Sequence, residues 1–178
     1  MFHKILGANS GEYFPMSISV QGNYESIFTN YQTLRAYKDK EITSMPRNVH
    51  QLLNVKLVIH VKAEDNIIDK IYDNITNGTE SFTLGRNEDL VRVDELKIVN
   101  TATENYGYIN KYNAYIPECI YKENEIQGIN YRLNTTYKIE KGLRKWNKVN
   151  AKFIEKHTNN ALENVEIDED GDYMFFCD

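Results

Sequence analysis

An α+β domain is the fold class that this sequence predicts, on three observations. Apolar and polar residues alternate over 16–24 and 53–62, as they do in strands that bury one face. A helical spacing of apolar residues follows at 64–75. From residue 112 onward the pattern is one of short β segments. Because the chain has 178 residues, 41% of them apolar, it is long enough for one domain with a hydrophobic core.

The first elements are the end of a helix and two strands. The apolar residues Ile5 and Leu6 come just before Gly7, so residues 1–6 read as the last turn or two of a helix. In the strand over 53–62, apolar residues alternate with polar ones such as His60. We expect the apolar face of that strand to be buried and its polar face to meet water.

The helix over 64–75 has an acidic first turn, which complements the positive helix N-terminus, and Gly78 ends it. A strand over 90–99 follows, whose apolar phase slips near Asp94 and so predicts a bulge. The β segments of the C-terminal half are 131–139, 149–154 and 173–176. The acidic run 168–172 lacks the spacing of a calcium loop and predicts a turn.

Strand, strand, helix and strand make up three quarters of a ferredoxin-like βαββαβ unit. No strand precedes residues 1–6, so the predicted domain is an incomplete ferredoxin-like (RRM-like) domain with the first strand missing. That strand is central in the fold, and its absence leaves open edges that recruit other strands. We therefore predict a truncated ferredoxin-like RNA-binding domain at 1–100, with a β-rich C-terminal subdomain at 101–178 packed on it.

The net charge of −5 is unevenly distributed. Seven acidic residues and no Lys or Arg lie between Thr158 and Asp178, whereas eight basic residues oppose two acidic ones between Arg132 and Lys156. Aromatic residues are interleaved with these basic ones. They could form a surface for single-stranded RNA, on which cations bind phosphates and rings stack on bases. The alternative, which the pattern alone favours, is a solvated hairpin whose aromatic residues face the core.

Several classes of protein are excluded or disfavoured by the sequence. Two cysteines without CxxC spacing argue against a disulfide framework and a cysteine zinc site. No apolar window is long enough for a membrane span, and the first residues make no signal peptide. We expect a cytoplasmic protein of a bacterial cell without membrane partners. No glycine-rich nucleotide loop occurs, so no cofactor is expected.

Three separated stretches resemble one family in the right order. Residues 84–90 read Leu-Gly-Arg-Asn-Glu-Asp-Leu, which is similar to the Leu-Gly-Arg-x-Glu-Asp-Leu signature of the CRISPR-associated Cas-five family, type I-B branch. Residues 16–24 resemble that family's second strand, and 113–117 with 128–133 resemble its C-terminal half. The resemblance covers nearly all of the chain.

The resemblance implies a non-catalytic subunit of Cascade, the crRNA-guided surveillance complex. Such a subunit caps the Cas-seven filament, grips the five-prime handle of the crRNA and contacts the Cas-eight subunit, and we expect no homo-oligomer. Arg86 is then the first candidate for the handle, with Gly85 allowing close approach; a turn-fixing salt bridge to a neighbouring acid is the alternative. The weaker RNA-binding candidates are Arg92, Arg132, Lys138, Arg144, Lys145 and Lys148.

The missing first strand departs from the family. A subunit that keeps its docking surfaces but lacks part of the site would compete with the intact subunit. The sequence therefore favours a truncated mimic that inhibits CRISPR interference, an anti-CRISPR. The alternatives are a productive Cascade subunit and a metal-independent ribonuclease that processes crRNA. The best general acid or base candidates for the ribonuclease are His157 and the neighbouring Lys156 or Lys152.

Overall fold

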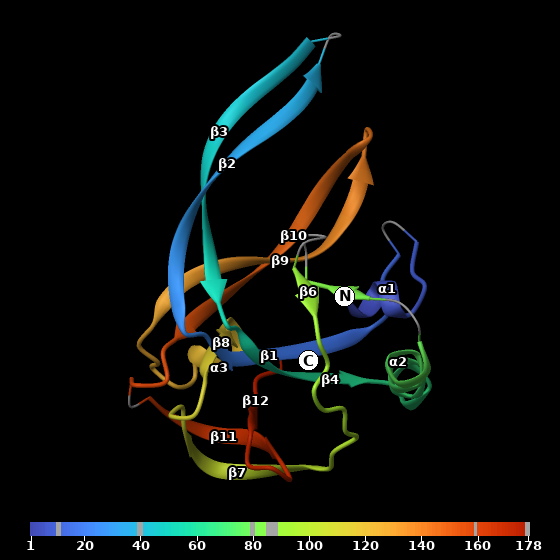
Figure 1. The fold of residues 1–178 in the computed structure, drawn as a ribbon. Helices are drawn as coiled ribbons and strands as arrows, with labels where there is room; N and C mark the ends of the chain where they lie inside the picture. Colours follow the sequence, from blue (N-terminus) through green and yellow to red (C-terminus); the bar gives the residue numbers. More distant parts are fainter. Residues whose placement is uncertain (10–11, 39–40, 79–80, 85–88, 159, 177–178) are drawn as a thin grey trace.

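The computed structural model describes residues 1–9, 12–38, 41–78, 81–84, 89–158 and 160–176 (Figure 1). The elements are α1 (Phe2–Ile5), β1 (Met16–Asn23), β2 (Ser26–Lys38), β3 (Glu41–Leu53), β4 (Lys56–Ala63), α2 (Asp65–Asn77), β5 (Phe82–Thr83), β6 (Leu90–Val91), β7 (Thr101–Tyr108), β8 (Asn113–Pro117), α3 (Glu118–Tyr121), β9 (Ile129–Glu140), β10 (Leu143–Ile154), β11 (Ala161–Asp168) and β12 (Tyr173–Met174). Strands dominate, and the α+β class is confirmed.

A five-stranded antiparallel sheet in the order β4-β1-β8-β10-β9 is the centre of the molecule. Strand β1 pairs with β4 along its whole length and with β8 through Gln21 and Gly22. The ranges 1–100 and 101–178 therefore meet inside one sheet by backbone pairing. The C-terminal half thus adds β8, β9 and β10 to the sheet of β1 and β4, while β7, β11 and β12 form a sheet of their own.

A second, three-stranded sheet in the order β12-β11-β7 lies below the first in Figure 1. Residues of β8, β10, β11, the chain end after β12 and the segments just after β7 and before β9 form the buried core. This core consists of Ile109, Ala114, Ile116, Ile126, Ile154, Leu162, Val165 and Phe175. Burying apolar side chains of this size stabilises a fold by about 1.5–3 kcal/mol each.

The face of β1 and β4 that carries their polar residues is the buried one. Ser19 accepts a hydrogen bond from the Phe175 N–H at 3.0 Å, and Gln21 donates one to the Tyr173 carbonyl at 2.9 Å. His60, only 9% exposed, lies 3.1 Å from Asp168. The expectation that the His60 face would meet water was wrong, because β11 and β12 cover this face and supply partners for its polar groups.

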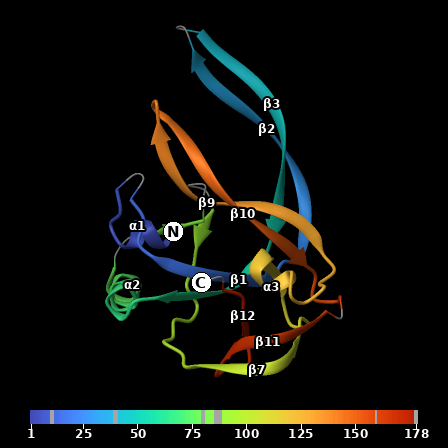
Figure 2. The same cartoon turned by 180° about the vertical axis from the view of Figure 1, so that it is seen from behind.

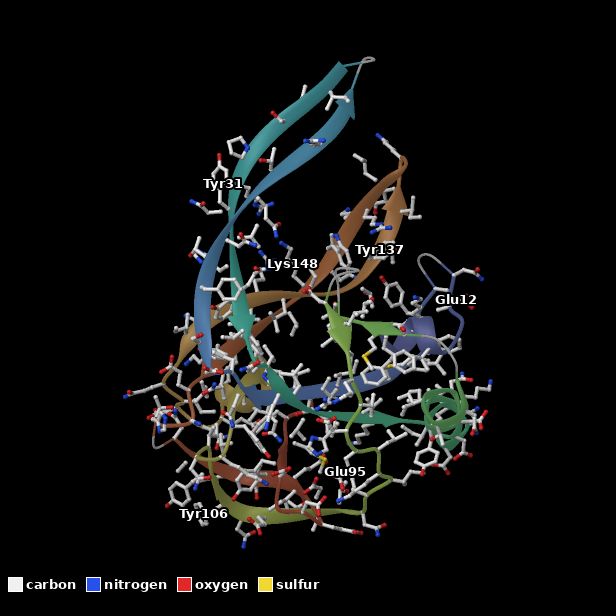
Figure 3. The ribbon with its side chains drawn as sticks, viewed as in Figure 1. Glu12, Tyr31, Glu95, Tyr106, Tyr137 and Lys148 are labelled. Atoms are coloured by element: carbon white, nitrogen blue, oxygen red, sulfur yellow. The ribbon has the colours of Figure 1, made fainter. Side chains whose placement is uncertain are left out.

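Strands β2 and β3 form a long two-stranded arm that rises from the sheet (Figures 1 and 2). The predicted strand over 53–62 is interrupted, because Asn54 has a φ of 51° and hydrogen-bonds to Glu25 where the arm meets β1 and β4. Large apolar side chains of the arm are exposed, among them Tyr31 at 68%, which Figure 3 labels. An arm with so little burial depends on its own ladder for order.

The predicted helix at 64–75 is confirmed as α2, which ends at Asn77. The predicted strand over 90–99 is confirmed only at Leu90–Val91. Residues 92–100 have no ladder partner in the part of the chain that is described, and their side chains bind the β11–β12 turn instead: Lys97 pairs with Asp170 at 2.8 Å. The outer edge of β4 also lacks a ladder partner among the described residues.

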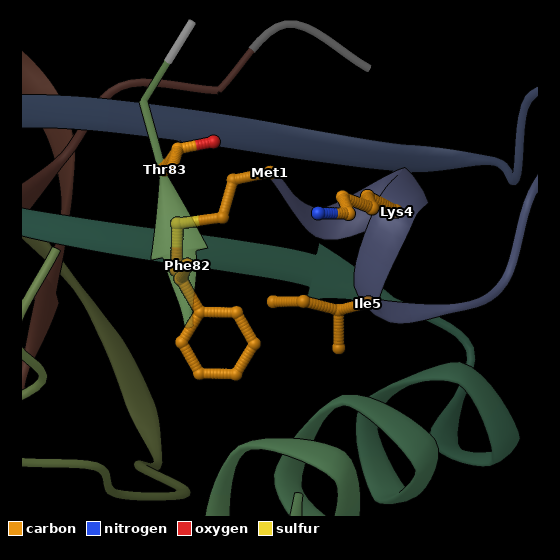
Figure 4. Close-up of a pocket in the computed structure, with 5 residues that line it drawn as sticks. All are labelled: Met1, Lys4, Ile5, Phe82 and Thr83. Carbon is orange, nitrogen blue, oxygen red and sulfur yellow. The ribbon is translucent and has the colours of Figure 1, made fainter. Parts of the chain in front are cut away.

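The ferredoxin-like arrangement stays a prediction. Strands β1 and β4 lie side by side and antiparallel, and α2 follows β4, as in the second and third strands of that fold. Helix α1 has four residues and hydrogen-bonds to α2 through the Ile5 carbonyl and Asn74. Met1 and Ile5 face Phe82 of β5 around a small pocket (Figure 4).

Two further properties bear on the sequence predictions. Among the described residues, no helix is both long and apolar enough to cross a membrane. Cys119 takes part in a disulfide, which the sequence argument against a disulfide framework did not foresee. The second cysteine of the chain, Cys177, lies outside the described residues.

Candidate nucleic-acid interface

The hairpin of β9 and β10 is a second arm, and a β-bulge decides which residues share its faces (Figure 1). Tyr137 pairs with Trp146 and Asn134 with Lys148, so two residues of β9 oppose the single Asn147 of β10. The bulge thus adds one residue to β9, which shifts the alternation of faces along β9 by one position between Asn134 and Tyr137. Thr135 and Thr136 indeed hydrogen-bond to Asn147 at 3.3 and 2.8 Å.

Because of the bulge, cations and aromatic rings lie on one face of the arm. We call this the basic face; it consists of Arg132, Tyr137, Arg144, Trp146 and Lys148. The guanidinium of Arg144 lies 4.9 Å from the centre of the Tyr137 ring, whose centre is 4.9 Å from that of Trp146. Trp146 remains 40% exposed. Aromatic rings beside exposed cations can bind bases and phosphates of a single strand.

Tyr137 is held in place from a distant part of the sequence. The hydroxyl of Tyr13 accepts a hydrogen bond from the Tyr137 N–H at 3.0 Å, and the two ring centres lie 5.7 Å apart at 85°. His3 of α1 in turn packs edge-on against Tyr13 at 5.0 Å. Burial, and then the charge of the N-terminal amine, lower the pKa of His3. The N-terminal segment therefore fixes one ring of the basic face.

The eight sequence-predicted RNA-binding residues separate into groups. Arg132, Arg144 and Lys148 lie together on the basic face, and all three are exposed. Lys138 and Lys145 pair with one another in the ladder and occupy the opposite face, where Lys145 binds Glu140 at 3.2 Å. The structure thus brings three of the five arm residues together.

The remaining predicted residues belong to the segment that contains the family-like motif. Gly85 and Arg86 lie outside the described residues. Arg92 is exposed, but its guanidinium contacts Asp94 at 2.5 Å, and this hydrogen bond raises the pKa of Arg92. Arg92 therefore already has a carboxylate partner, which makes it a poorer phosphate ligand than the cations of the basic face.

The predicted acidic turn at 168–172 is confirmed, and it lies on β11 and β12, at the end of the molecule opposite the tips of the arms (Figures 1 and 2). Burial acts to raise the pKa of Asp168, but hydrogen bonds from the backbone of Asp172, from His60 and from the backbone of Asp170 outweigh it. The pKa of Asp168 is therefore lowered.

The residues considered for catalysis lie at the end of β10 and just after it: Lys152, Lys156 and His157. Lys152 donates a hydrogen bond to the Ile126 carbonyl at 2.6 Å and lies over the Tyr121 ring. His157 is exposed. The described residues include no group of three or more His, Cys, Asp or Glu side chains placed to hold a metal ion.

No family model, curated protein or solved structure matches this chain. The arrangement of the arm is accordingly the main evidence on function. Sequence reasoning missed the role of Tyr13, since no local pattern connects residues 124 positions apart. It also missed the bulge, because the apolar and aromatic residues of β9 occupy every second position without a visible shift. These residues are Tyr131, Leu133, Tyr137 and Ile139.

Proposed function

We propose that this chain is a non-catalytic, RNA-binding component of the Cas-five type that docks into a type I-B Cascade complex and inhibits CRISPR interference as a mimic. The observation that carries the RNA-binding part is the basic face of the β9–β10 arm. Arg144 packs on the Tyr137 ring beside Trp146 there, and the exposed Arg132 and Lys148 lie on the same face. The acid that reaches this face, Glu118, binds Asn150 and is paired with Lys122. The Cascade assignment comes from the resemblance of residues 84–90 and its two companion stretches.

The outer edge of β4 has no ladder partner among the described residues. An open sheet edge can accept a strand of another chain, so this edge supports docking to a neighbouring component. The choice of a mimic over a productive subunit comes from the resemblance, and a mimic would act by competing with the intact subunit for its position.

The RNA-binding proposal is tested with paired variants of the arm. We expect Arg144→Ala with Trp146→Ala to weaken binding of a fluorescent CRISPR-repeat RNA at least tenfold, because a cation and a stacking ring are lost. The matched control is Lys138→Ala with Lys145→Ala, which removes two charges from the opposite face and should change affinity less than threefold. Equal losses in both double variants would contradict the assignment of the basic face.

The Cascade proposal is tested by co-expressing the chain with a complete type I-B system and counting plasmid escape. Lost immunity together with co-purification of Cascade subunits supports the mimic. Restored immunity in a strain that lacks its own Cas-five subunit supports a productive subunit instead. If the chain neither co-purifies with Cascade nor alters immunity, both Cascade functions are wrong.

A further inference from the structure

Strand β7 is the outer strand of the three-stranded sheet, at the end of the molecule opposite the tips of the arms (Figures 1 and 2). It pairs with β11 from Thr101 to Tyr108, and no described strand pairs with it on its other side. Seven of its eight residues are exposed, all except Gly107. Strand β7 therefore has a free edge.

The hydrogen bonds around β7 show which backbone groups point to this edge. The N–H of Ile109, just after β7, donates at 3.3 Å to the segment that precedes β11. The Glu163 N–H, opposite Tyr106 in the ladder, points away from β7 and donates to Asn124 at 2.7 Å. Because backbone groups alternate along an antiparallel ladder, Tyr106 and Tyr108 direct their N–H and C=O groups to the free edge.

The sequence of β7 does not protect this edge. Edge strands commonly carry lysine or proline, which prevents pairing with other chains. The outer strands β4 and β9 of the five-stranded sheet contain Lys or Arg. Strand β7 reads Thr-Ala-Thr-Glu-Asn-Tyr-Gly-Tyr, with neither a basic residue nor a proline, and its ladder with β11 keeps one register. A further strand can therefore add to it.

The side chains beside the free edge favour a particular kind of strand. Tyr106 and Tyr108 lie two residues apart and so share one face of β7, where they are 66% and 57% exposed. Tyr106 lies at the margin of the molecule in Figure 3. Gly107 faces the other side, where a Cβ would meet the Tyr173 ring at 2.9 Å. The two exposed rings can pack against apolar or cationic side chains of an added strand.

Charge selects a basic strand. The three strands of this sheet contain no Lys or Arg and four acids, which are Glu104, Glu163, Glu166 and Asp168. The lysines that approach the sheet are paired with acids of β11 or of the β11–β12 turn; they are Lys62, Lys97 and Lys111. Glu104 is exposed on β7 itself. Phosphates of a nucleic acid would be repelled there, and a second copy of β7 would bring two Glu104 carboxylates together.

We propose that the free edge of β7 binds an extended, lysine- or arginine-bearing segment of a partner protein by β-strand addition. The backbone of that segment hydrogen-bonds to Tyr106 and Tyr108, and a basic side chain lies near Glu104 and the Tyr106 ring. A helix would not pair with this edge, because its own backbone groups are bonded internally. The inference depends neither on the basic face nor on the Cascade assignment.

Two extended peptides of the length of β7 test the proposal. Valine alternates with lysine in one and with glutamate in the other, and binding to the full chain is measured by fluorescence anisotropy. We expect the lysine peptide to bind at least tenfold more tightly than the glutamate peptide. Glu104→Lys should weaken binding of the lysine peptide at least fivefold. Asp69→Lys, which makes the same charge change at an exposed position of α2, should leave its affinity within twofold.

A second pair of variants tests the backbone pairing. Tyr106→Ala removes the ring alone, whereas Tyr106→Pro also removes the N–H group that faces the free edge. Tyr106→Pro should therefore weaken binding of the lysine peptide at least tenfold more than Tyr106→Ala does. A lysine peptide that is N-methylated along its backbone keeps its side chains but loses its hydrogen-bond donors. It should not bind the wild-type chain, a result that needs no change in the protein.

The proposal is overturned if neither peptide binds, if the glutamate peptide binds as tightly as the lysine peptide, or if the N-methylated peptide binds like the unmodified one. Equal losses in Tyr106→Pro and Tyr106→Ala, with the circular dichroism spectrum of the wild type in both, also overturn it. So does a dimer of the chain, seen in sedimentation, that Tyr106→Pro dissociates, because the edge would then belong to a second copy.

Discussion

Single polar side chains connect the two sheets. His60 of β4 and Asp168 of β11 lie 3.1 Å apart with side chains 9% and 5% exposed. Asp168 also accepts the backbone N–H groups of Asp170 and Asp172 at 3.0 and 2.7 Å. One carboxylate therefore closes the β11–β12 turn and holds β4 against it, in an environment where an unpaired charge would be costly.

We expect Asp168→Asn to lower the free energy of unfolding by about 1–3 kcal/mol at pH 7, because a buried charge-assisted hydrogen bond is lost. The folded pKa of Asp168 is below its ordinary value of 3.8. Its ionised form thus stabilises the fold above that pH, and the contribution disappears as the pH falls through the lower folded pKa.

Urea unfolding at pH 7 and at about pH 3 measures this effect; the difference between wild type and Asp168→Asn should shrink at the lower pH. Glu163→Gln, at an exposed position of the same strand, should change the free energy of unfolding by less than about 0.5 kcal/mol at both pH values. A difference that stays constant with pH would show that the charge of Asp168 is not the cause.

At the scale of elements, the β2–β3 arm is the least buried part of the described chain. Its two 13-residue strands pair mainly with each other, in an unbroken register from Ser26↔Leu53 to Lys38↔Glu41. The core residues all lie elsewhere. The arm therefore adds exposed surface rather than stability to the body, as expected of an element used for contacts with other molecules.

Replacing residues 30–49 by Asn-Gly, which makes a two-residue hairpin between Thr29 and His50, should leave the body folded. We expect the melting temperature to change by less than about 4 °C, because only ladder pairs within the arm are removed. Thermal melting followed by circular dichroism checks this. Replacing the buried Ile71 of α2 by Ala should cost about 2–5 kcal/mol and serves as the contrasting variant. A collapse of the melting temperature in the shortened chain would mean that the arm supports the fold.

At the scale of the whole molecule, charge is separated between two ends. The β9–β10 arm carries the basic face, while the acids of β11 and of the β11–β12 turn lie at the far end (Figure 1). Several of these acids are paired with lysines from other elements, including Lys62 with Glu166 and Lys97 with Asp170. Exposed charges separated by more than about 10 Å are largely screened at 0.1 M salt. A net negative chain can therefore still present a local surface for RNA.

RNA affinity should accordingly fall about 20-fold between 50 and 200 mM salt. This fall is the salt dependence of the binding constant expected when about three cations contact the phosphates of a single strand. Glu163→Gln with Glu169→Gln, which removes two acidic charges at the far end, should leave both the affinity and the slope within twofold. Anisotropy titrations with the repeat RNA measure both. A slope near zero, or a strong effect of the acidic variants, would contradict binding through the basic face.

Much of the local structure was determined by the sequence alone. The helix at α2 and the strands β1, β9 and β10 follow from apolar periodicity, which acts within a few residues. The concentration of cations between Arg132 and Lys156 and the acidic turn at 168–172 could also be read directly.

Only the tertiary structure decided which faces are buried and which residues act together. His60 is buried because β11 and β12 cover a face that its own strand pattern marks as polar. The bulge at Thr135 and Thr136 puts Tyr137 on the same face as the cations while Tyr131 lies on the opposite face, although both residues follow the same alternation in the sequence. Burial and facing depend on partners that are distant along the chain, and a local pattern holds no information about them.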